Sequence, residues 1–126
     1  MALTDQVPVK SPFNGQSTGK EVLANLHLTG KTAIVTGGYS GIGLETTRAL
    51  AEKGVKVIVP VRSRGKATKN LGTVAGEVEI ALLDLSSIES VNSFTNKMLT
   101  ELGKLDFLIN NAGIMACPET RIGPGW

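Results

Sequence analysis

The feature that most constrains this chain is a glycine-rich turn between an apolar run and an amphipathic pattern. Residues 32–36 are apolar and β-branched without polar alternation, which predicts a strand buried on both faces of a parallel sheet. Residues 37–43 are rich in glycine, and a helical pattern follows over about 41–53 until Gly54 stops it. The predicted buried face of this helix consists of Ile42, Thr46, Ala49 and Leu50.

The position of this turn favours a phosphate site. Glycines let the backbone turn sharply and approach a phosphate group without a Cβ clash. The helix that follows would offer unpaired N–H groups and the positive end of its dipole. The spacing Gly-x-x-x-Gly-x-Gly differs both from Gly-x-Gly-x-x-Gly and from the P-loop pattern. The alternative is a tight turn that only packs a helix on a sheet.

The rest of the chain alternates strand and helix patterns. Apolar runs predict strands over 55–61, 77–83 and 105–109. Regular pairing of the first of these should end near Val59, because Pro60 has no N–H to donate.

Two further helices are predicted between these strands. A short helix would begin after a cap at Ser63 and run to about Leu71, and a longer one would open on a capping box at 86–89 and end at Gly103. The apolar residues of the longer helix recur every three or four positions and are predicted to be core: Ile88, Val91, Phe94, Met98, Leu99 and Leu102. This alternation predicts an α/β protein with right-handed crossovers and helices on both faces of a parallel sheet.

The first 28 residues are predicted to form an N-terminal arm. Residues 1–16 show no periodicity, whereas 18–21 carry a capping-box pattern that predicts a short helix over about 20–26. We therefore separate an arm, 1–28, from the remainder, 29–126.

Composition excludes several classes of protein. The chain has 126 residues, of which 41% are hydrophobic and 19% charged, so intrinsic disorder is not expected. The net charge of +2 comes without a basic run, so we expect no nucleic-acid partner and no membrane partner. No apolar run approaches the ~18 residues that span a bilayer, and the first residues do not resemble a signal peptide. With Cys117 as its single cysteine, the protein is expected to be cytoplasmic.

Three motifs resemble those of the short-chain dehydrogenase/reductase family. They are Thr36-Gly37-x-x-x-Gly41-Ile42-Gly43, Asp84-Leu85 and Asn110-Asn111-Ala112-Gly113. The likeness covers about residues 17–126 and is to the N-terminal half of the family, in particular to bacterial members related to retinol dehydrogenases. It implies a Rossmann-type doubly wound parallel sheet, of which this chain holds the first four strands in the order 3-2-1-4. It also implies a nicotinamide cofactor, so that 29–126 would be a partial dinucleotide-binding domain.

The resemblance assigns cofactor-binding roles to residues of each motif. Those that would line the pyrophosphate or shape its loop are Gly37, Tyr39, Ser40, Gly41 and Ile42. Asp84 would accept a hydrogen bond from the adenine amino group, with Leu85 beside the ring. The residues that would lie along the adenosine ribose are Asn111, Ala112 and Gly113. For Asp84 the alternative is an ordinary turn or helix-cap residue.

The end of the second predicted strand favours NADP(H) over NAD(H). NAD-specific sites usually place Asp or Glu about 20 residues past the loop, where it binds the ribose 2′-hydroxyl. From Gly41 that distance reaches Val61, which cannot make this bond. Arg62 and Arg64 follow, and arginine can hold a 2′-phosphate through charge-assisted contacts. The alternative is that these arginines belong to a solvated basic face, which would discriminate less strongly between NADP(H) and NAD(H).

No catalytic residue and no metal site is predicted in this chain. The resemblance implies a Tyr-x-x-x-Lys pair as the catalytic machinery, yet the only tyrosine is Tyr39, and Gly43 stands four residues later. One histidine, His27, and one cysteine, Cys117, are too few for a usual zinc site, and a nucleophilic pair of the two is not expected.

We therefore expect this chain to be the cofactor-binding half of an NADP(H)-dependent oxidoreductase that interconverts carbonyl compounds and alcohols. The full-length protein would act on a small molecule and form a homo-oligomer, whereas the 126-residue chain alone would be inactive. The chain looks truncated, because the implied catalytic pair is missing and the resemblance implies a full length about twice as great. The open side of its fourth strand would then leave apolar residues without a neighbour. The alternative is a non-catalytic nucleotide-binding or regulatory module with the same fold.

Overall fold

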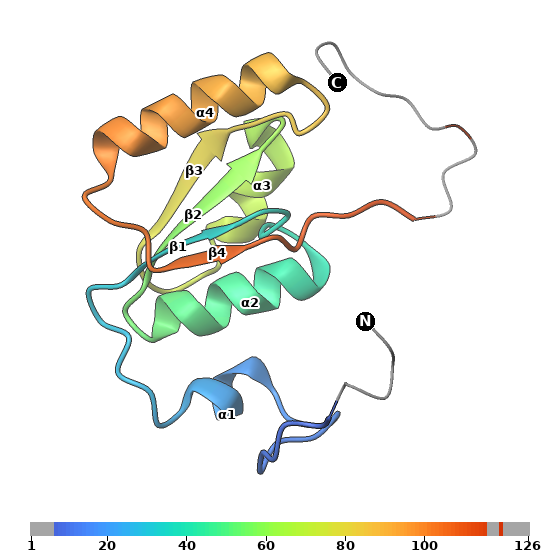
Figure 1. Ribbon diagram of the computed structural model, residues 1–126, viewed down its shortest axis with the longest axis vertical. Coiled ribbons are helices and arrows are strands. Elements are labelled where there is room, and N and C mark those ends of the chain that lie inside the picture. Colours follow the sequence, from blue (N-terminus) through green and yellow to red (C-terminus); the bar gives the residue numbers. More distant parts are fainter. Residues whose placement is uncertain (1–6, 116–118, 120–126) are drawn as a thin grey trace.

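The computed structural model describes residues 7–115 and 119 and contains a four-stranded parallel sheet (Figure 1). The strands are β1 (Thr32–Val35), β2 (Lys56–Val61), β3 (Val78–Leu82) and β4 (Phe107–Ile109). The helices are α1 (Gly19–Leu23), α2 (Gly41–Glu52), α3 (Arg64–Leu71) and α4 (Ile88–Glu101). The strand order β3-β2-β1-β4 confirms the predicted Rossmann-type α/β arrangement.

Different helices cover the two faces of the sheet (Figure 1). Val35 of β1 belongs to a buried cluster with Leu50 of α2 and Ala67 of α3. Its neighbour Ile34 belongs to a second cluster with Met98 of α4. Successive side chains of a strand point to opposite faces, and both faces are covered here, so the strand must be apolar at every position. This is why β1 appears in the sequence as a continuous apolar run.

Pro60 does not interrupt β2, and the expectation that regular pairing would end near Val59 is wrong for the β3 side and confirmed only for the β1 side. The register with β3 continues through Val61. N–H groups alternate in direction along a strand, and that of Lys56 points to the β1 side, so position 60 faces β1 as well. Pairing between β1 and β2 extends only to Ile58. The missing N–H of Pro60 therefore lies beyond the last paired residue and costs no hydrogen bond.

The buried face of α2 differs from the prediction at Ile42, which is 83% exposed. Ala49 and Leu50 are buried as predicted, and the buried face continues with Thr47 and Gly43, about one and two turns before Leu50. Ile42 lies in the first turn of the helix, next to the glycine-rich turn, and belongs to neither buried cluster.

The start of α4 is one residue later than its predicted capping box. Ser87 is the N-cap, and its side chain accepts a hydrogen bond from the backbone N–H of Ser90. The expected box between Ser86 and Glu89 is therefore wrong. Ser86 instead donates both its N–H and its hydroxyl to Asp84, because the turn after β3 already uses it.

The apolar face of α4 is buried less than predicted. Met98 is its buried residue, whereas Leu99, assigned to the core from the sequence, is 75% exposed. A groove of about 430 Å³ lies between α4 and β4, and Leu108 of β4 is 58% exposed there. Within the described residues β4 pairs only with β1, so one side of this strand is open.

The N-terminal arm contacts the rest of the fold through α1. The predicted capping box is present: Glu21 N–H donates to the Thr18 hydroxyl, and Thr18 N–H donates to the Glu21 carboxylate. The helix ends at Leu23, earlier than expected. Just after it, the carbonyl of Ala24 accepts a 2.6 Å hydrogen bond from Lys53 Nζ of the segment that follows α2.

Candidate functional site

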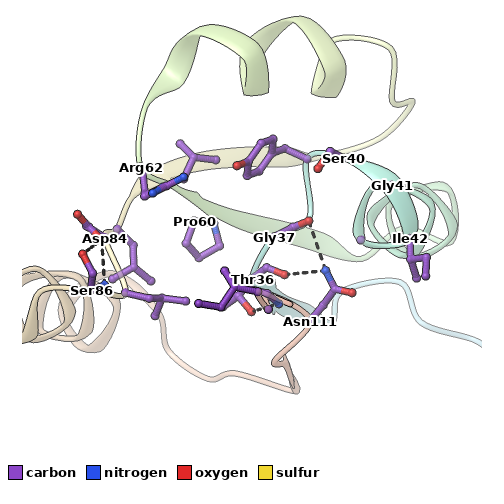
Figure 2. Close-up of a pocket in the computed structure, with 18 residues that line it drawn as sticks. Thr36, Gly37, Ser40, Gly41, Ile42, Pro60, Arg62, Asp84, Ser86 and Asn111 are labelled. Atoms are coloured by element: carbon purple, nitrogen blue, oxygen red, sulfur yellow. Dashed lines mark hydrogen bonds between the residues drawn. The ribbon is translucent and has the colours of Figure 1, made fainter. Parts of the chain in front are cut away.

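A cleft of about 890 Å³ lies at the carboxyl edge of the sheet, where the strand order reverses between β1 and β4. The predicted site residues that line it are Gly37, Tyr39, Ser40, Gly41, Ile42, Arg62, Asp84, Leu85, Asn111, Ala112 and Gly113. The other lining residues are Thr36, Gly43, Pro60, Val61, Leu83, Ser86 and Ile114. Figure 2 shows Arg62 and Asp84 at one end of the cleft and Ile42 at the other, with Gly37 and Asn111 between them.

Arg64 is a predicted site residue that does not line the cleft. Its Nη1 donates to the carbonyl of Ile80 at 3.3 Å, so its side chain lies along β3. Arg62 directly follows β2 and does line the cleft. Ser63, the N-cap of α3, separates the two arginines, and the chain turns there from strand to helix. Because of this turn, Arg62 lines the cleft, whereas the Arg64 side chain lies against β3.

The segment after β4 is tied to the end of β1 by side-chain hydrogen bonds (Figure 2). Asn111 Nδ2 donates to the carbonyls of Thr36, at 3.1 Å, and Gly37, at 3.4 Å. The Thr36 hydroxyl accepts from Ala112 N–H at 3.0 Å and donates to the Ile109 carbonyl at 3.4 Å. These bonds place two of the sequence motifs, far apart in the chain, on one wall of the cleft.

The loop between β1 and α2 requires glycine at particular positions. Gly37 and Gly41 have φ of 65° and 54°, a left-handed conformation that side chains disfavour. A Cβ on Gly43 would overlap the carbonyl oxygen of Gly37 and the side-chain amide of Asn111. The loop therefore presents its backbone to the cleft, without a covering side chain at these positions.

Two of the helices that begin beside the cleft, α2 and α3, lack side-chain caps. Ser40 and Ser63 occupy the N-cap positions of α2 and α3, but neither side chain accepts a cap hydrogen bond, and neither first turn carries an acidic residue. In α1 and α4, by contrast, the N-cap side chain is bonded and an acidic residue stands in the first turn. The first N–H groups of an α-helix have no partner within the helix. Both helix starts therefore suit an anion.

Asp84 takes part in a local turn and also lines the cleft. Its Oδ1 accepts from the N–H of Ser86 at 2.9 Å and from its hydroxyl at 2.6 Å. These hydrogen bonds hold the pKa of the Asp84 carboxyl below its ordinary value, and the positive charge of Arg62 contributes in the same direction. Asp84 is thus a turn residue, as the alternative interpretation predicted. Its ionised carboxylate can still accept a hydrogen bond from a ligand in the cleft.

Several residues of the cleft were left out of the predicted site. Thr36 and Gly43 stand inside the glycine motif, so its spacing could have identified them. Ser86 follows Asp84 by two residues, which is the spacing of an Asx turn. Asn70 does not line the cleft, but its Nδ2 donates to the carbonyl of the lining residue Tyr39 from 31 residues away, and no local signal in the sequence marks this contact.

Other kinds of site are not found in the described part of the chain. Residues 7–115 and 119 contain no group of three or more metal-binding side chains. Within the same residues, no helix is both long and apolar enough to cross a membrane. Cys117, considered above as a nucleophile, lies outside the described residues. The full sequence has Tyr39 as its only tyrosine.

Comparison with known proteins gives relatives of one kind. The family described as short chain dehydrogenase matches residues 31–123. The chain is 38% identical over 124 residues to the WW domain-containing oxidoreductase of Drosophila melanogaster, which covers 93% of this chain and 30% of that protein. It is 39% identical over 108 residues to retinol dehydrogenase 11 of Mus musculus, covering 82% of this chain and 34% of that protein.

A similar solved structure is also that of a short-chain oxidoreductase. A metagenomic short-chain oxidoreductase, crystallised in complex with NADP, superposes with a TM-score of 0.63 at 33% identity, covering 71% of this chain and 42% of that one. The chain thus spans about a third of the length of the two curated relatives. The glycine loop, the strand order and the family match together establish that this chain belongs to the short-chain dehydrogenase family.

Proposed function

We propose that this chain is the cofactor-binding half of an NADP(H)-dependent oxidoreductase that interconverts a small carbonyl compound and an alcohol. The proposal rests on the glycine loop at the uncapped start of α2. This loop lines a cleft at the point where the strand order reverses between β1 and β4. A bound nicotinamide would supply or accept the hydride. The residues of this chain would bind and orient the dinucleotide.

The pyrophosphate is assigned to the loop between β1 and α2. Gly37 and Gly41 would let the backbone approach it, and the first N–H groups of α2 would donate to its oxygens. The Ser40 hydroxyl caps nothing and would add a donor. Tyr39 packs against the buried core and would fix the shape of the loop, with Ile42 lying along the phosphates.

The adenosine is assigned to the opposite end of the cleft. Asp84, whose lowered pKa keeps it ionised, would accept from the adenine amino group. Leu85 is partly exposed and would lie against the ring. The backbone of the segment Asn111–Gly113 would follow the ribose, held in place by its bonds to Thr36.

The preference for NADP(H) is assigned to the end of β2. Val61 offers no acceptor for a ribose 2′-hydroxyl, whereas Arg62 lines the cleft beside the uncapped start of α3. A 2′-phosphate would meet a guanidinium and helix N–H groups there. Arg64 would have to leave the Ile80 carbonyl to reach the same phosphate, so we assign it the smaller contribution. The NADP complex of the metagenomic relative supports this preference.

The proton-transfer machinery is assigned to another part of the protein. Tyr39, the only tyrosine, is in the cofactor loop and has Gly43 in place of a lysine four residues later. We further propose that residues 29–126 form a partial dinucleotide-binding domain behind the arm 1–28. The complete protein would be cytoplasmic and would form a homo-oligomer.

Turnover by the complete protein tests this proposal. It should oxidise NADPH when members of a panel of aldehydes and ketones are added, and the absorbance of the reduced nicotinamide measures this reaction. It should use NADH less efficiently than NADPH. Tight NADPH binding without turnover of any carbonyl or alcohol would favour the non-catalytic nucleotide-binding module instead. No binding of either dinucleotide would refute both functions.

A further inference from the structure

The carbonyl groups of the cofactor loop are held from outside the loop at four consecutive residues. The carbonyls of Thr36 and Gly37 both accept from Asn111. The carbonyl of Gly38 accepts a 2.8 Å hydrogen bond from the hydroxyl of Thr47, a fully buried residue of α2. The next carbonyl, that of Tyr39, accepts from Asn70. Three separate elements thus supply the donors.

These bonds matter because carbonyl groups and phosphates repel one another. A flexible glycine loop can turn its carbonyl oxygens toward the cleft as easily as its N–H groups. Each carbonyl that is bonded to a donor on the scaffold is fixed in direction, so the loop need not reorder when an anion binds. Fixing donors in advance lowers the cost of ligand binding.

Asn70 lies outside the known motifs, as Thr47 does, and it is the donor that comes from α3. It is half-buried in the last turn of α3, and its Nδ2 lies 2.9 Å from the Tyr39 carbonyl. Asparagine is a poor helix former, so the helix itself does not explain its presence. The same helix begins two residues after Arg62. Asn70 therefore connects the glycine loop to the helix at the opposite side of the cleft.

We propose that Asn70 is a positioning residue that holds the Tyr39 carbonyl away from the cleft and fixes the loop for a dinucleotide pyrophosphate. It touches the loop and not the ligand. The inference rests on the proposed function, because it assigns the pyrophosphate to this loop. It adds a determinant of cofactor affinity at the far end of α3.

Two variants of Asn70 and one matched control test this role in the complete protein. Asn70→Ala removes the donor, and Asn70→Asp keeps the shape but turns an acceptor toward the Tyr39 carbonyl. Asn96→Ala makes the same truncation at an exposed position of α4. Calorimetric titration with NADP and with adenosine 2′-phosphate, which lacks a pyrophosphate, separates an effect on the loop from an effect on α3. Thermal unfolding and amide hydrogen exchange of residues 37–41 are measured on the ligand-free protein.

We expect the Asn70 variants to lose affinity for NADP but not for adenosine 2′-phosphate. Asn70→Ala should raise the Kd of NADP roughly three- to tenfold, as the loss of one hydrogen bond implies, and Asn70→Asp should raise it more. The Kd of adenosine 2′-phosphate should stay within twofold of wild type. Exchange of the loop amides should speed up in both variants, and Asn96→Ala should match wild type throughout.

Other outcomes overturn the inference in distinguishable ways. If wild type binds NADP and Asn70→Ala binds it equally well, the positioning role is wrong and the proposed function stands. Equal losses for NADP and adenosine 2′-phosphate would mean that Asn70 supports α3 as a whole, which also contradicts the role. If wild type binds no dinucleotide, the proposed function fails, and the binding role of Asn70 fails with it.

Discussion

Gly43 in α2 lies so close to Gly37 that a Cβ on Gly43 would overlap the Gly37 carbonyl oxygen. The same Cβ would overlap the Asn111 side-chain amide, which holds the segment after β4 in place. Neither neighbour can move freely, since one is backbone and the other is bonded to two carbonyls. The first turn of α2, the glycine loop and the segment after β4 therefore meet at a point where only glycine fits.

Gly43→Ala should damage the cleft more than it damages the fold. The added methyl group must push the loop and the Asn111 segment apart, a strain of about 1–3 kcal/mol for overpacking. We expect a lower midpoint of thermal unfolding and a Kd for NADPH raised at least tenfold, measured by nicotinamide fluorescence. Gly103→Ala is the control, because a Cβ there has open space and its φ is not left-handed. Unchanged NADPH affinity in Gly43→Ala would contradict the close packing.

Asp106 should make folding stability depend on pH. Its Oδ2 accepts from the backbone N–H of Thr32 at 2.8 Å, and its Oδ1 lies 3.2 Å from Lys104 Nζ and 3.4 Å from Lys31 Nζ. The Thr32 hydrogen bond, with help from the two lysines, holds the pKa of Asp106 below its ordinary value. A carboxyl whose pKa is lowered by folding stabilises the fold above its unfolded-state pKa, and this contribution is lost as pH falls through the folded-state pKa.

Asp106→Asn is the variant that isolates this contribution. At neutral pH it should unfold at a lower temperature than wild type, because the charge facing two lysines is gone. The difference should shrink at acid pH, as the pH falls from the ordinary pKa of an aspartate through the lowered pKa of folded Asp106 and wild type also loses the charge. Scanning calorimetry across this pH range makes the comparison. A difference that stays constant down to low pH would show that the charge of Asp106 contributes nothing.

The fold could be predicted largely because its signals are local. The continuous apolar run at 32–36, the glycine turn and the Thr18–Glu21 capping box each specify backbone geometry within a few residues, and the alternation of strands and helices limits the topology. The errors arose where a distant partner decides the outcome. Pro60 is tolerated because β1 stops short of it, and Leu99 is exposed because nothing in the described residues covers the outer side of β4.

In the candidate site, too, the residues with a local signal could be predicted, and those placed by a distant partner could not. The loop glycines and Arg62 follow from spacing along the chain, and the structure brings them to one cleft. The direction of Arg64 depends on the Ile80 carbonyl of a strand whose register the sequence does not specify. The Asn70 contact depends on where the end of α3 packs, so no local pattern marks it.

The 126-residue chain should associate with itself through the groove between α4 and β4. Leu99 and Leu108 expose apolar surface on both sides of this groove, and β4 has an open edge in the described residues. Exposed apolar patches and unpaired edges both drive association. Leu99→Glu should shift the chain toward monomer in sedimentation velocity experiments. Val9→Glu, at a still more exposed apolar position of the arm, should leave association unchanged. A monodisperse wild-type chain would refute the prediction.

The isolated 126-residue chain should bind NADPH without catalysing carbonyl reduction. Its sequence has no Tyr-x-x-x-Lys pair, which would place an acidic hydroxyl next to a cation. Purified chain incubated with NADPH and aldehydes should oxidise the cofactor no faster than buffer does. Sustained turnover proportional to the concentration of the chain would mean that the chain holds a catalytic group outside the known motif.

If the cleft binds NADP(H) and Arg62 provides the preference for it, paired titrations of wild type and Arg62→Ala with NADPH and NADH should show it. Wild type should bind NADPH more tightly than NADH. Arg62→Ala should weaken NADPH about tenfold, as expected for losing a charge-assisted hydrogen bond, and leave NADH nearly unchanged. Arg64→Ala should have the smaller effect, because Arg64 faces Ile80. Equal or tighter binding of NADH by wild type, or equal losses for both cofactors in Arg62→Ala, would mean that Arg62 does not select NADP(H).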